Sequence, residues 1–259
     1  MLNFSSKAAS EPRGAPGYRA YAIGDIHGRL DLLEQLLAKI HSDLQRRPAA
    51  KTLLVFVGDL IDRGPSSAQV IERLRTYRRD GVRPVFILGN HEEVLLRILR
   101  GDAQLIAKWR WFGGSECLQS YGADAVQMSH LTDDEALSLV RSVIPRNHVK
   151  FLESFVDSCR FGDYLFVHAG IRPGVDLDQQ TQSDLRWIRE PFLLDETDHG
   201  FLVVHGHTIT AEVDERPNRI GIDTGAYRTD ILTALAIEGA DRWLIDTRAN
   251  SLNETNQRN

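Results

Sequence analysis

Three short motifs, each lying between an apolar run and a helical pattern, constrain the fold of this chain most strongly. They are Gly-Asp-Ile-His-Gly at residues 24–28, Gly-Asp-Leu-Ile-Asp-Arg-Gly at residues 58–64 and Gly-Asn-His-Glu at residues 89–92. Three strand–loop–helix units in succession predict right-handed crossovers and a parallel sheet. Ligands of such sheets bind at the carboxyl ends of the strands. We therefore expect one sheet edge to collect the Asp, Asn and His side chains of all three motifs.

The rest of the chain predicts a second layer and an insertion. The apolar runs before the motifs predict strands at residues 19–23, 53–57 and 84–88. A mostly helical pattern at about residues 101–156 predicts a helical cap insertion. Later runs predict strands at residues 164–167, 201–204, 219–222, 231–237 and 242–245. Because turn residues separate these short strands, they suggest a second mixed sheet packed on the first. The expected fold is an α/β sandwich of two mixed β-sheets flanked by helices.

Composition narrows the domain organisation and the partners. We expect a disordered arm at residues 1–17, one domain at residues 18–246 and a polar tail at residues 247–259. A net charge of −5 without a long basic block argues against nucleic acid as a partner. No run of about 18 apolar residues exists, so we expect no membrane span. Cys117 and Cys159 form no Cys-x-x-Cys pattern, and the start lacks the apolar core of a signal peptide, so we expect a cytoplasmic protein of undetermined oligomeric state.

The polar residues at the strand ends are typical ligands of divalent metals. One residue separates Asp25 from His27, so on an extended strand end both side chains point the same way and can bind one ion. Asp59 follows the neighbouring strand, from which a carboxylate can bridge two ions. Asn90 offers an amide oxygen, and two later histidines, His168 and His207, also end apolar runs. Oxygen donors beside imidazoles on adjacent loops predict a site for two divalent metals.

These motifs, in this order, resemble those of the calcineurin-like metallophosphoesterases over about residues 19–245. The pair Asp62-Arg63 and Glu92 are similar to the phosphoprotein-phosphatase branch, especially small bacterial and phage serine/threonine phosphatases. The resemblance implies that Asp25 and His27 hold the first metal, with Asp59 bridging. It implies that the second metal is held by Asn90, His168 and His207. It also implies in-line attack by a metal-bridging hydroxide.

The resemblance also implies roles for residues beside the metals. His91 matches the proton donor for the leaving group, and Asp62 would orient its ring. Arg63 matches a phosphate clamp, because a planar guanidinium can hold two oxygens. For a second clamp we rank Arg189 first, since residues 184–190 resemble a segment of the phage-type enzymes, with Arg172 as the competitor.

The resemblance implies a hydrolase of phosphoserine or phosphothreonine in proteins. The alternative is a symmetrical dinucleoside tetraphosphate hydrolase, whose relatives tend to lose the aspartate at the position of Asp62. An alternative of another class is a non-catalytic metal-binding scaffold that recognises phosphorylated partners. The expected partner is a phosphorylated protein or a small phosphoester, with no nucleic acid or membrane. A set of His, Asp and Asn ligands accepts Mn, Fe or Zn. We expect two divalent ions and favour Mn²⁺ over Fe or Zn.

Several other polar and aromatic residues have an ordinary structural explanation. We expect His205 to be structural or to support a metal ligand, and Asp223 to bind loop amides, with contact to the site as its alternative. We expect Glu92 and Glu93 to cap a helix. Four further histidines are expected on the surface: His41, His130, His148 and His199. Three aromatic residues are expected to pack inside the insertion, with lining of a substrate groove as the alternative: Trp109, Trp111 and Tyr121.

Overall fold

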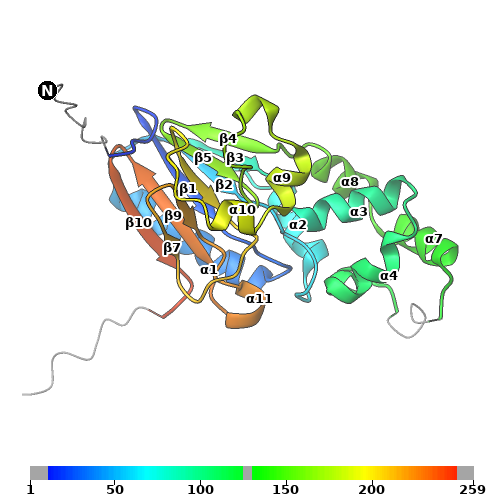
Figure 1. Ribbon diagram of the computed structural model, residues 1–259. Coiled ribbons are helices and arrows are strands. Elements are labelled where there is room, and N and C mark those ends of the chain that lie inside the picture. The colour runs from blue at the N-terminus through cyan, green and yellow to red at the C-terminus, as the bar shows by residue number, and fades with distance from the viewer. Residues whose placement is uncertain (1–10, 125–129, 250–259) are drawn as a thin grey trace, which may run out of the picture.

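Within residues 11–124 and 130–249, which the computed structural model describes, ten strands form two five-stranded sheets (Figure 1). The strands of the first sheet, in spatial order, are β10 (Asp241–Asp246), β9 (Thr233–Glu238), β1 (Tyr18–Ile23), β2 (Lys51–Phe56) and β3 (Val82–Phe86). As predicted, β1, β2 and β3 are parallel. The other two strands are antiparallel to their neighbours, so the sheet is mixed.

The second sheet is also mixed and packs on the first. Its strands, in spatial order, are β4 (Ser158–Phe161), β5 (Tyr164–Val167), β6 (Leu202–His205), β8 (Arg219–Gly221) and β7 (Asp214–Glu215). The three central strands are parallel, and both edge strands are antiparallel. The sandwich of two mixed sheets predicted from the sequence is therefore confirmed.

Alternating side chains of β1 show how the layers are built. Tyr21 and Ile23 enter the core under the helices, whereas Ala20 and Ala22 enter the core between the sheets. The helices on the outer side of the first sheet are α1 (Leu30–Arg46), α2 (Ser67–Arg75) and α3 (Asn90–Arg100). The elements outside the second sheet include η2 (Leu177–Gln179), α9 (Gln182–Trp187) and α10 (Glu190–Leu193), and α11 (Ala226–Thr229) precedes β9. Among the described residues, no helix is long and apolar enough to cross a membrane.

A helical insertion lies between α3 and β4, as predicted. Its elements are α4 (Leu105–Trp109), the kinked π-helical turn η1 (Arg110–Gly114), α5 (Ser115–Ser120), α7 (Asp133–Val143) and α8 (Arg146–Leu152). Figure 1 shows α4, α7 and α8 gathered at the end of the molecule opposite β9 and β10. Buried side chains of the insertion, such as Ile106 and Val140, share one core with α2 and α3. The insertion is therefore packed as part of the main body.

The strands predicted at residues 231–237 and 242–245 were assigned to the wrong sheet. They correspond to β9 and β10, and β9 pairs with β1 in the first sheet. Both faces of β9 are buried, with Ala234 and Ala236 under the helices and Leu235 and Ile237 between the sheets. Because an apolar run without alternation can pair in either sheet, its pattern does not identify its neighbour.

The described residues of the predicted arm and tail are held against the main body. In the predicted disordered arm, residues 11–17 are held, because the Gly14 N–H donates to Gly239 O at 2.7 Å and the Arg13 N–H donates to Asp163 at 2.9 Å. At the other end, Thr247 is buried, and its hydroxyl oxygen accepts the N–H of Leu232 at 3.0 Å. The remainders of both predicted tails, residues 1–10 and 250–259, lie outside the described residues.

Candidate active site

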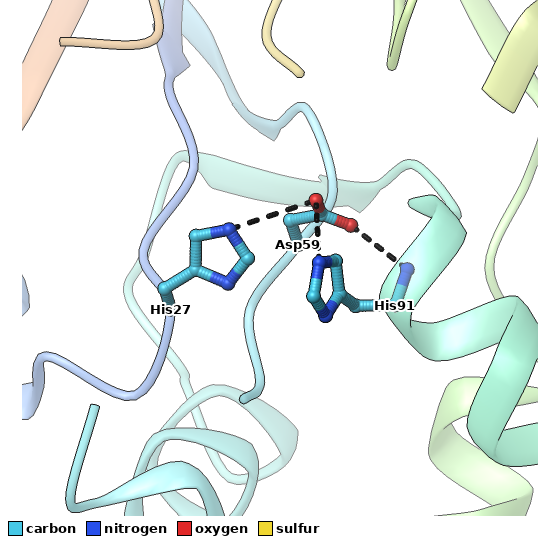
Figure 2. Close-up of side chains that lie close together, drawn as sticks. All are labelled: His27, Asp59 and His91. Atoms are coloured by element: carbon cyan, nitrogen blue, oxygen red, sulfur yellow. Dashed lines mark hydrogen bonds and ion pairs between the residues drawn. The ribbon is translucent and has the colours of Figure 1, made fainter. Parts of the chain in front are cut away.

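The loops after β1, β2 and β3 bring His27, Asp59 and His91 together. Figure 2 shows both imidazole rings beside the Asp59 carboxylate. Asp59 Oδ2 lies 3.7 Å from His27 Nε2 and 3.9 Å from His91 Nε2, and Asp59 Oδ1 accepts the His91 backbone N–H at 3.1 Å. All three side chains are buried, and their ligand atoms lie within 4.8 Å of one another. The three motifs thus meet at one sheet edge, as their spacing predicts.

A second cluster shares Asp59 and adds two histidines from the loops after β5 and β6. His168 Nε2 lies 3.4 Å from Asp59 Oδ1 and 2.9 Å from Asn90 Oδ1. The His207 ring stands edge-on to the His168 ring, with centroids 5.0 Å apart. The ligand atoms of Asp59, His168 and His207 again lie within 4.8 Å of one another. Asp59 therefore stands between two groups of imidazoles, each of which could hold a divalent cation.

Backbone carbonyls orient two of these imidazoles. His27 Nδ1 lies 2.8 Å from Ile61 O, and His168 Nδ1 lies 2.8 Å from Val57 O. Because a carbonyl oxygen only accepts, each Nδ1 carries a proton, and Nε2 is the ring nitrogen that faces the site. This is the orientation that a metal-binding histidine needs.

Two buried side-chain atoms at this site form no hydrogen bond within the described part of the chain and are free to bind a metal. Asp25 Oδ1 and His207 Nε2 are buried and lack a hydrogen-bond partner among the described residues. Burial, with the nearby Asp223 and Asp59 carboxylates, raises the pKa of Asp25 well above its usual range. Burial also lowers the pKa of His27 to about 3 and that of His207 to about 2, so both rings are neutral. Crowded carboxylates and free imidazole lone pairs fit divalent cations.

Asp25 lies beside the second cluster. It belongs to neither cluster, and its Oδ2 accepts the backbone N–H of His207 at 3.0 Å. The strand alternation from which the pairing of Asp25 and His27 was predicted does not extend to these residues, because His27 has a left-handed backbone with φ of 46°. The chain turns after Ile23, where β1 ends, so the alternation of a strand no longer applies.

Backbone strain is concentrated at this site. Among the described residues, six non-glycine residues have positive φ, and five of them come from the motifs or the His207 loop: His27, Asp59, Asp62, Arg63 and His207. Each left-handed non-glycine residue costs about 1–3 kcal/mol and persists only where its surroundings hold it. Such strain is typical of sites where side chains must be held in one position.

Glu92 does more than cap α3. Its carboxylate is fully buried and accepts the N–H of Gly89 at 3.1 Å, as expected of a cap. It also accepts the N–H groups of Asp59, Leu60 and Ile61 at 2.9, 2.8 and 3.3 Å. Glu92 therefore supports the loop that carries Asp59. The sequence signal for this role is only its place three residues after a glycine at a helix start.

Asp62 and His91 form a buried pair. Asp62 Oδ2 accepts the His91 Nδ1–H at 2.6 Å, and the same oxygen accepts the indole N–H of Trp109 at 2.9 Å. Burial acts to lower the pKa of His91, but the Asp59 and Asp62 carboxylates outweigh it and raise this pKa to about 9. The ring is therefore protonated at neutral pH, so its Nε2, which faces Asp59, can donate a proton.

Arg189 and Arg172, the two candidates for the second phosphate clamp, lie in different places. Arg189 lines the pocket over the clusters, together with Arg63, whose guanidinium donates to the Tyr227 hydroxyl at 3.1 Å. Arg172 does not line this pocket, and its guanidinium pairs with Asp184 at 2.6 Å. The sequence did not indicate Tyr227, which follows a glycine-rich turn far along the chain.

The pocket over the clusters has a volume of about 580 Å³ and an apolar outer wall. Trp109, Phe112 and Trp187 contribute to this wall. Trp109 is therefore packed in the insertion and also lines the pocket, so both explanations weighed for it apply. Trp111 and Tyr121 do not line the pocket, and Trp111 is 86% exposed, so its predicted packing is wrong.

Three of the remaining histidines are less exposed than expected. His148 is buried between Glu72, at 3.0 Å from its Nε2, and the Tyr121 hydroxyl, at 2.9 Å from its Nδ1. His41 and His199 are half-buried. A helical pattern with few apolar residues does not reveal which polar side chain another helix will cover, so the surface prediction fails for His148.

Other structural expectations are confirmed. His130 is exposed. His205 is buried, with its Nδ1 at 3.0 Å from Gly206 O, and it belongs to neither His/Asp cluster. Asp223 accepts the N–H of Gly225 at 2.9 Å, and it also lines the pocket.

The sandwich, the two His/Asp clusters and the pocket suit a metal-dependent hydrolase, and comparison with known proteins agrees on the class. A family model for the calcineurin-like phosphoesterases matches residues 18–242, so the chain belongs to this family of metal-dependent hydrolases. It is 28% identical over 232 residues to the asymmetrical bis(5'-nucleosyl)-tetraphosphatase PrpE of Bacillus subtilis, covering 82% of this chain and 87% of that protein. It is 29% identical over 226 residues to serine/threonine-protein phosphatase 1 of Salmonella typhimurium, covering 84% and 91%.

Solved structures share the fold. A candidate diadenosine tetraphosphatase superposes with a TM-score of 0.61 at 22% identity, covering 89% of this chain and 94% of that one. A cold-active protein tyrosine phosphatase superposes with a TM-score of 0.56 at 18% identity, covering 94% and 87%. The chain is thus similar over most of its length to phosphatases of proteins and of dinucleotides.

Proposed function

We propose that this protein hydrolyses phosphate monoesters with alkoxide leaving groups, and that its substrate is phosphoserine or phosphothreonine in proteins. The observation that carries the proposal is the 2.6 Å hydrogen bond between His91 Nδ1 and Asp62 Oδ2 beside the His/Asp clusters. An alkoxide is a poor leaving group unless it is protonated as its bond to phosphorus breaks. A charged imidazole held by a carboxylate supplies that proton.

The other side chains have complementary tasks. Arg63 and Arg189 bind the phosphate oxygens from the pocket wall. Asp62 holds the His91 ring so that Nε2 faces the leaving oxygen. The chemistry that two divalent ions supply when bound is Lewis-acid stabilisation and activation of water at neutral pH. We propose that the ions are Mn²⁺. The residues that would hold them are Asp25, His27, Asp59, Asn90, His168 and His207.

Dinucleoside tetraphosphate hydrolysis is the second candidate, and one observation favours it. The aromatic wall formed by Trp109, Phe112 and Trp187 could stack a nucleobase. In that reaction the leaving group is a nucleotide phosphate, which departs without a proton. The Asp62-His91 pair would then have little to do, so we rank this candidate second.

The test is a comparison of rates with Mn²⁺ on a phosphoserine peptide and on diadenosine tetraphosphate. We expect a higher kcat/KM on the peptide, and a His91→Asn variant that loses about 10²–10⁴-fold on it. A higher kcat/KM on the dinucleotide would instead select the second candidate. Phosphate release from neither substrate by the folded, metal-loaded protein would favour the non-catalytic scaffold.

A further inference from the structure

We propose that Trp109, in the helical insertion, is a positioning residue for the proposed general acid. Its indole N–H donates to Asp62 Oδ2 at 2.9 Å, and the same oxygen accepts His91 Nδ1–H at 2.6 Å. Asp62 is fully buried and Trp109 is only 2% exposed, so water does not replace the indole if it is lost. This inference rests on the proposed function, because it concerns the proton that His91 delivers.

Two donors on one carboxylate oxygen restrict the carboxylate more than one donor does. With His91 alone, the Asp62 side chain could rotate about its terminal bond and take the imidazole with it. The hydrogen bond from the indole N–H is a second contact that fixes the plane of the Asp62 carboxylate. Asp62 and His91 then keep one orientation. A general acid is efficient only when its proton lies within hydrogen-bond reach of the leaving oxygen.

The insertion is shaped to keep the indole in this place. Gly114 lies against the Trp109 ring, so closely that any side chain at Gly114 would overlap it. Gly113 has φ of 110°, and a Cβ there would lie 2.7 Å from Arg63 Cγ. The carbonyl of Gly113 accepts the Arg63 N–H at 3.1 Å.

One short segment of the insertion therefore contacts two consecutive strained residues of the second motif. Asp62 and Arg63 have φ of 71° and 66°, and neither conformation is favoured by its side chain. Trp109 bonds the Asp62 side chain, while Gly113 bonds the Arg63 backbone. Simple core packing would explain a buried indole, but it does not require the indole N–H to meet the carboxylate oxygen that holds His91.

A positioning role has a signature that packing lacks. General acid catalysis matters when the leaving oxygen is basic, as in phosphoserine, and matters little for p-nitrophenol, which leaves as a stable anion. Trp109→Phe keeps an aromatic ring in the pocket wall. It removes the N–H donor together with the part of the indole that carries it. We expect kcat on a phosphoserine peptide to fall on the order of tenfold, as for loss of an outer partner of a catalytic group. On p-nitrophenyl phosphate we expect a much smaller change, with KM nearly constant.

The experiment compares Trp109→Phe, His91→Asn and a matched control on both substrates with Mn²⁺. The control is Trp243→Phe on β10, which also removes an indole N–H bonded to an aspartate, Asp43, at 3.1 Å, far from the pocket. We expect the control to leave both rates unchanged. Equal losses on the two substrates for Trp109→Phe, or no loss on either, would overturn the proposal. If His91→Asn itself does not discriminate between the substrates, the proposed function fails, whatever Trp109→Phe does.

A measurement on the wild-type protein covers the case in which Trp109→Phe does not fold. The four tryptophans should give separate indole N–H signals in the NMR spectrum. We expect one signal, assigned to Trp109, to be protected from exchange and to move in Asp62→Asn. A Trp109 indole that exchanges freely, or that is unmoved by Asp62→Asn, would contradict the hydrogen bond on which the proposal depends.

Discussion

Glu92→Gln is the substitution whose effect can be worked out most fully from the structure. Glu92 Oε1 accepts the N–H groups of Leu60 and Ile61, and Oε2 accepts those of Asp59 and Gly89. Glutamine replaces one oxygen by an NH₂ group, so whichever way the amide turns, two buried N–H groups face a donor. Each buried unsatisfied donor costs about 1–3 kcal/mol, which gives about 2–6 kcal/mol for the pair.

One effect works in the opposite direction. Burial, together with the Asp59 carboxylate, raises the pKa of Glu92 to about 7, so the neutral amide is relieved of a repulsion that the carboxylate suffers. We therefore expect a loss near the lower end, about 2 kcal/mol in the free energy of unfolding. A total stability of about 5–15 kcal/mol makes this loss easy to measure.

The assay is urea denaturation of the metal-free protein at a pH above 7, where Glu92 is ionised, followed by tryptophan fluorescence. The matched control is Glu135→Gln, because Glu135 is likewise the third residue of a helix, α7, and bonds its N-cap Thr132, but it is exposed. We expect a much smaller loss for the control. A loss for Glu92→Gln no larger than that for Glu135→Gln would refute the reasoning.

Three further predictions concern catalysis and metal binding. Because only protonated His91 can act as an acid, kcat on a phosphoserine peptide should fall as pH rises above the pKa of His91. Asp62→Asn removes a carboxylate that raises this pKa, so the fall should move to lower pH; a pH–rate profile unaltered by Asp62→Asn would contradict the prediction. Arg189→Ala should lower kcat/KM about 10–100-fold. Arg172→Ala, outside the pocket, should have little effect. A larger loss for Arg172→Ala would instead make Arg172 the second phosphate clamp. Each Mn²⁺ ion at 100 times its Kd should stabilise the protein by about 2.7 kcal/mol, seen as a higher Tm, and His207→Ala should reduce the total gain; a Tm that Mn²⁺ does not change in either protein would argue against the metal site.

Much of the site was predictable because its residues are local to the strand ends. The loops after β1, β2 and β3 meet since parallel strands joined by helices all end at the same edge of a sheet. The parallel strands β5 and β6 of the second sheet likewise end together, and the packing of the two sheets brings His168 and His207 beside the loops of the first sheet. Residue types at these ends then indicated metal ligands without any knowledge of contacts.

Other features could not be read from local pattern. Trp109 lies 47 residues from Asp62 in the chain, and no periodicity indicates that its indole meets that carboxylate. His148 is buried by Glu72 and Tyr121, which belong to other helices. Asp25 lies against the His207 backbone because the chain turns directly after β1.

The sequence alone determined the class of fold, the edge of the sheet where the candidate metal ligands gather and the kinds of atoms found there. These follow from strand order, crossover handedness and donor chemistry, which are properties of short segments. The tertiary structure alone decided that β9 joins the first sheet, that Glu92 supports the Asp59 loop and that the insertion meets Asp62. Those contacts arise when separate segments compete to bury the same surface, and the outcome depends on shape and on unpaired polar groups across the whole fold.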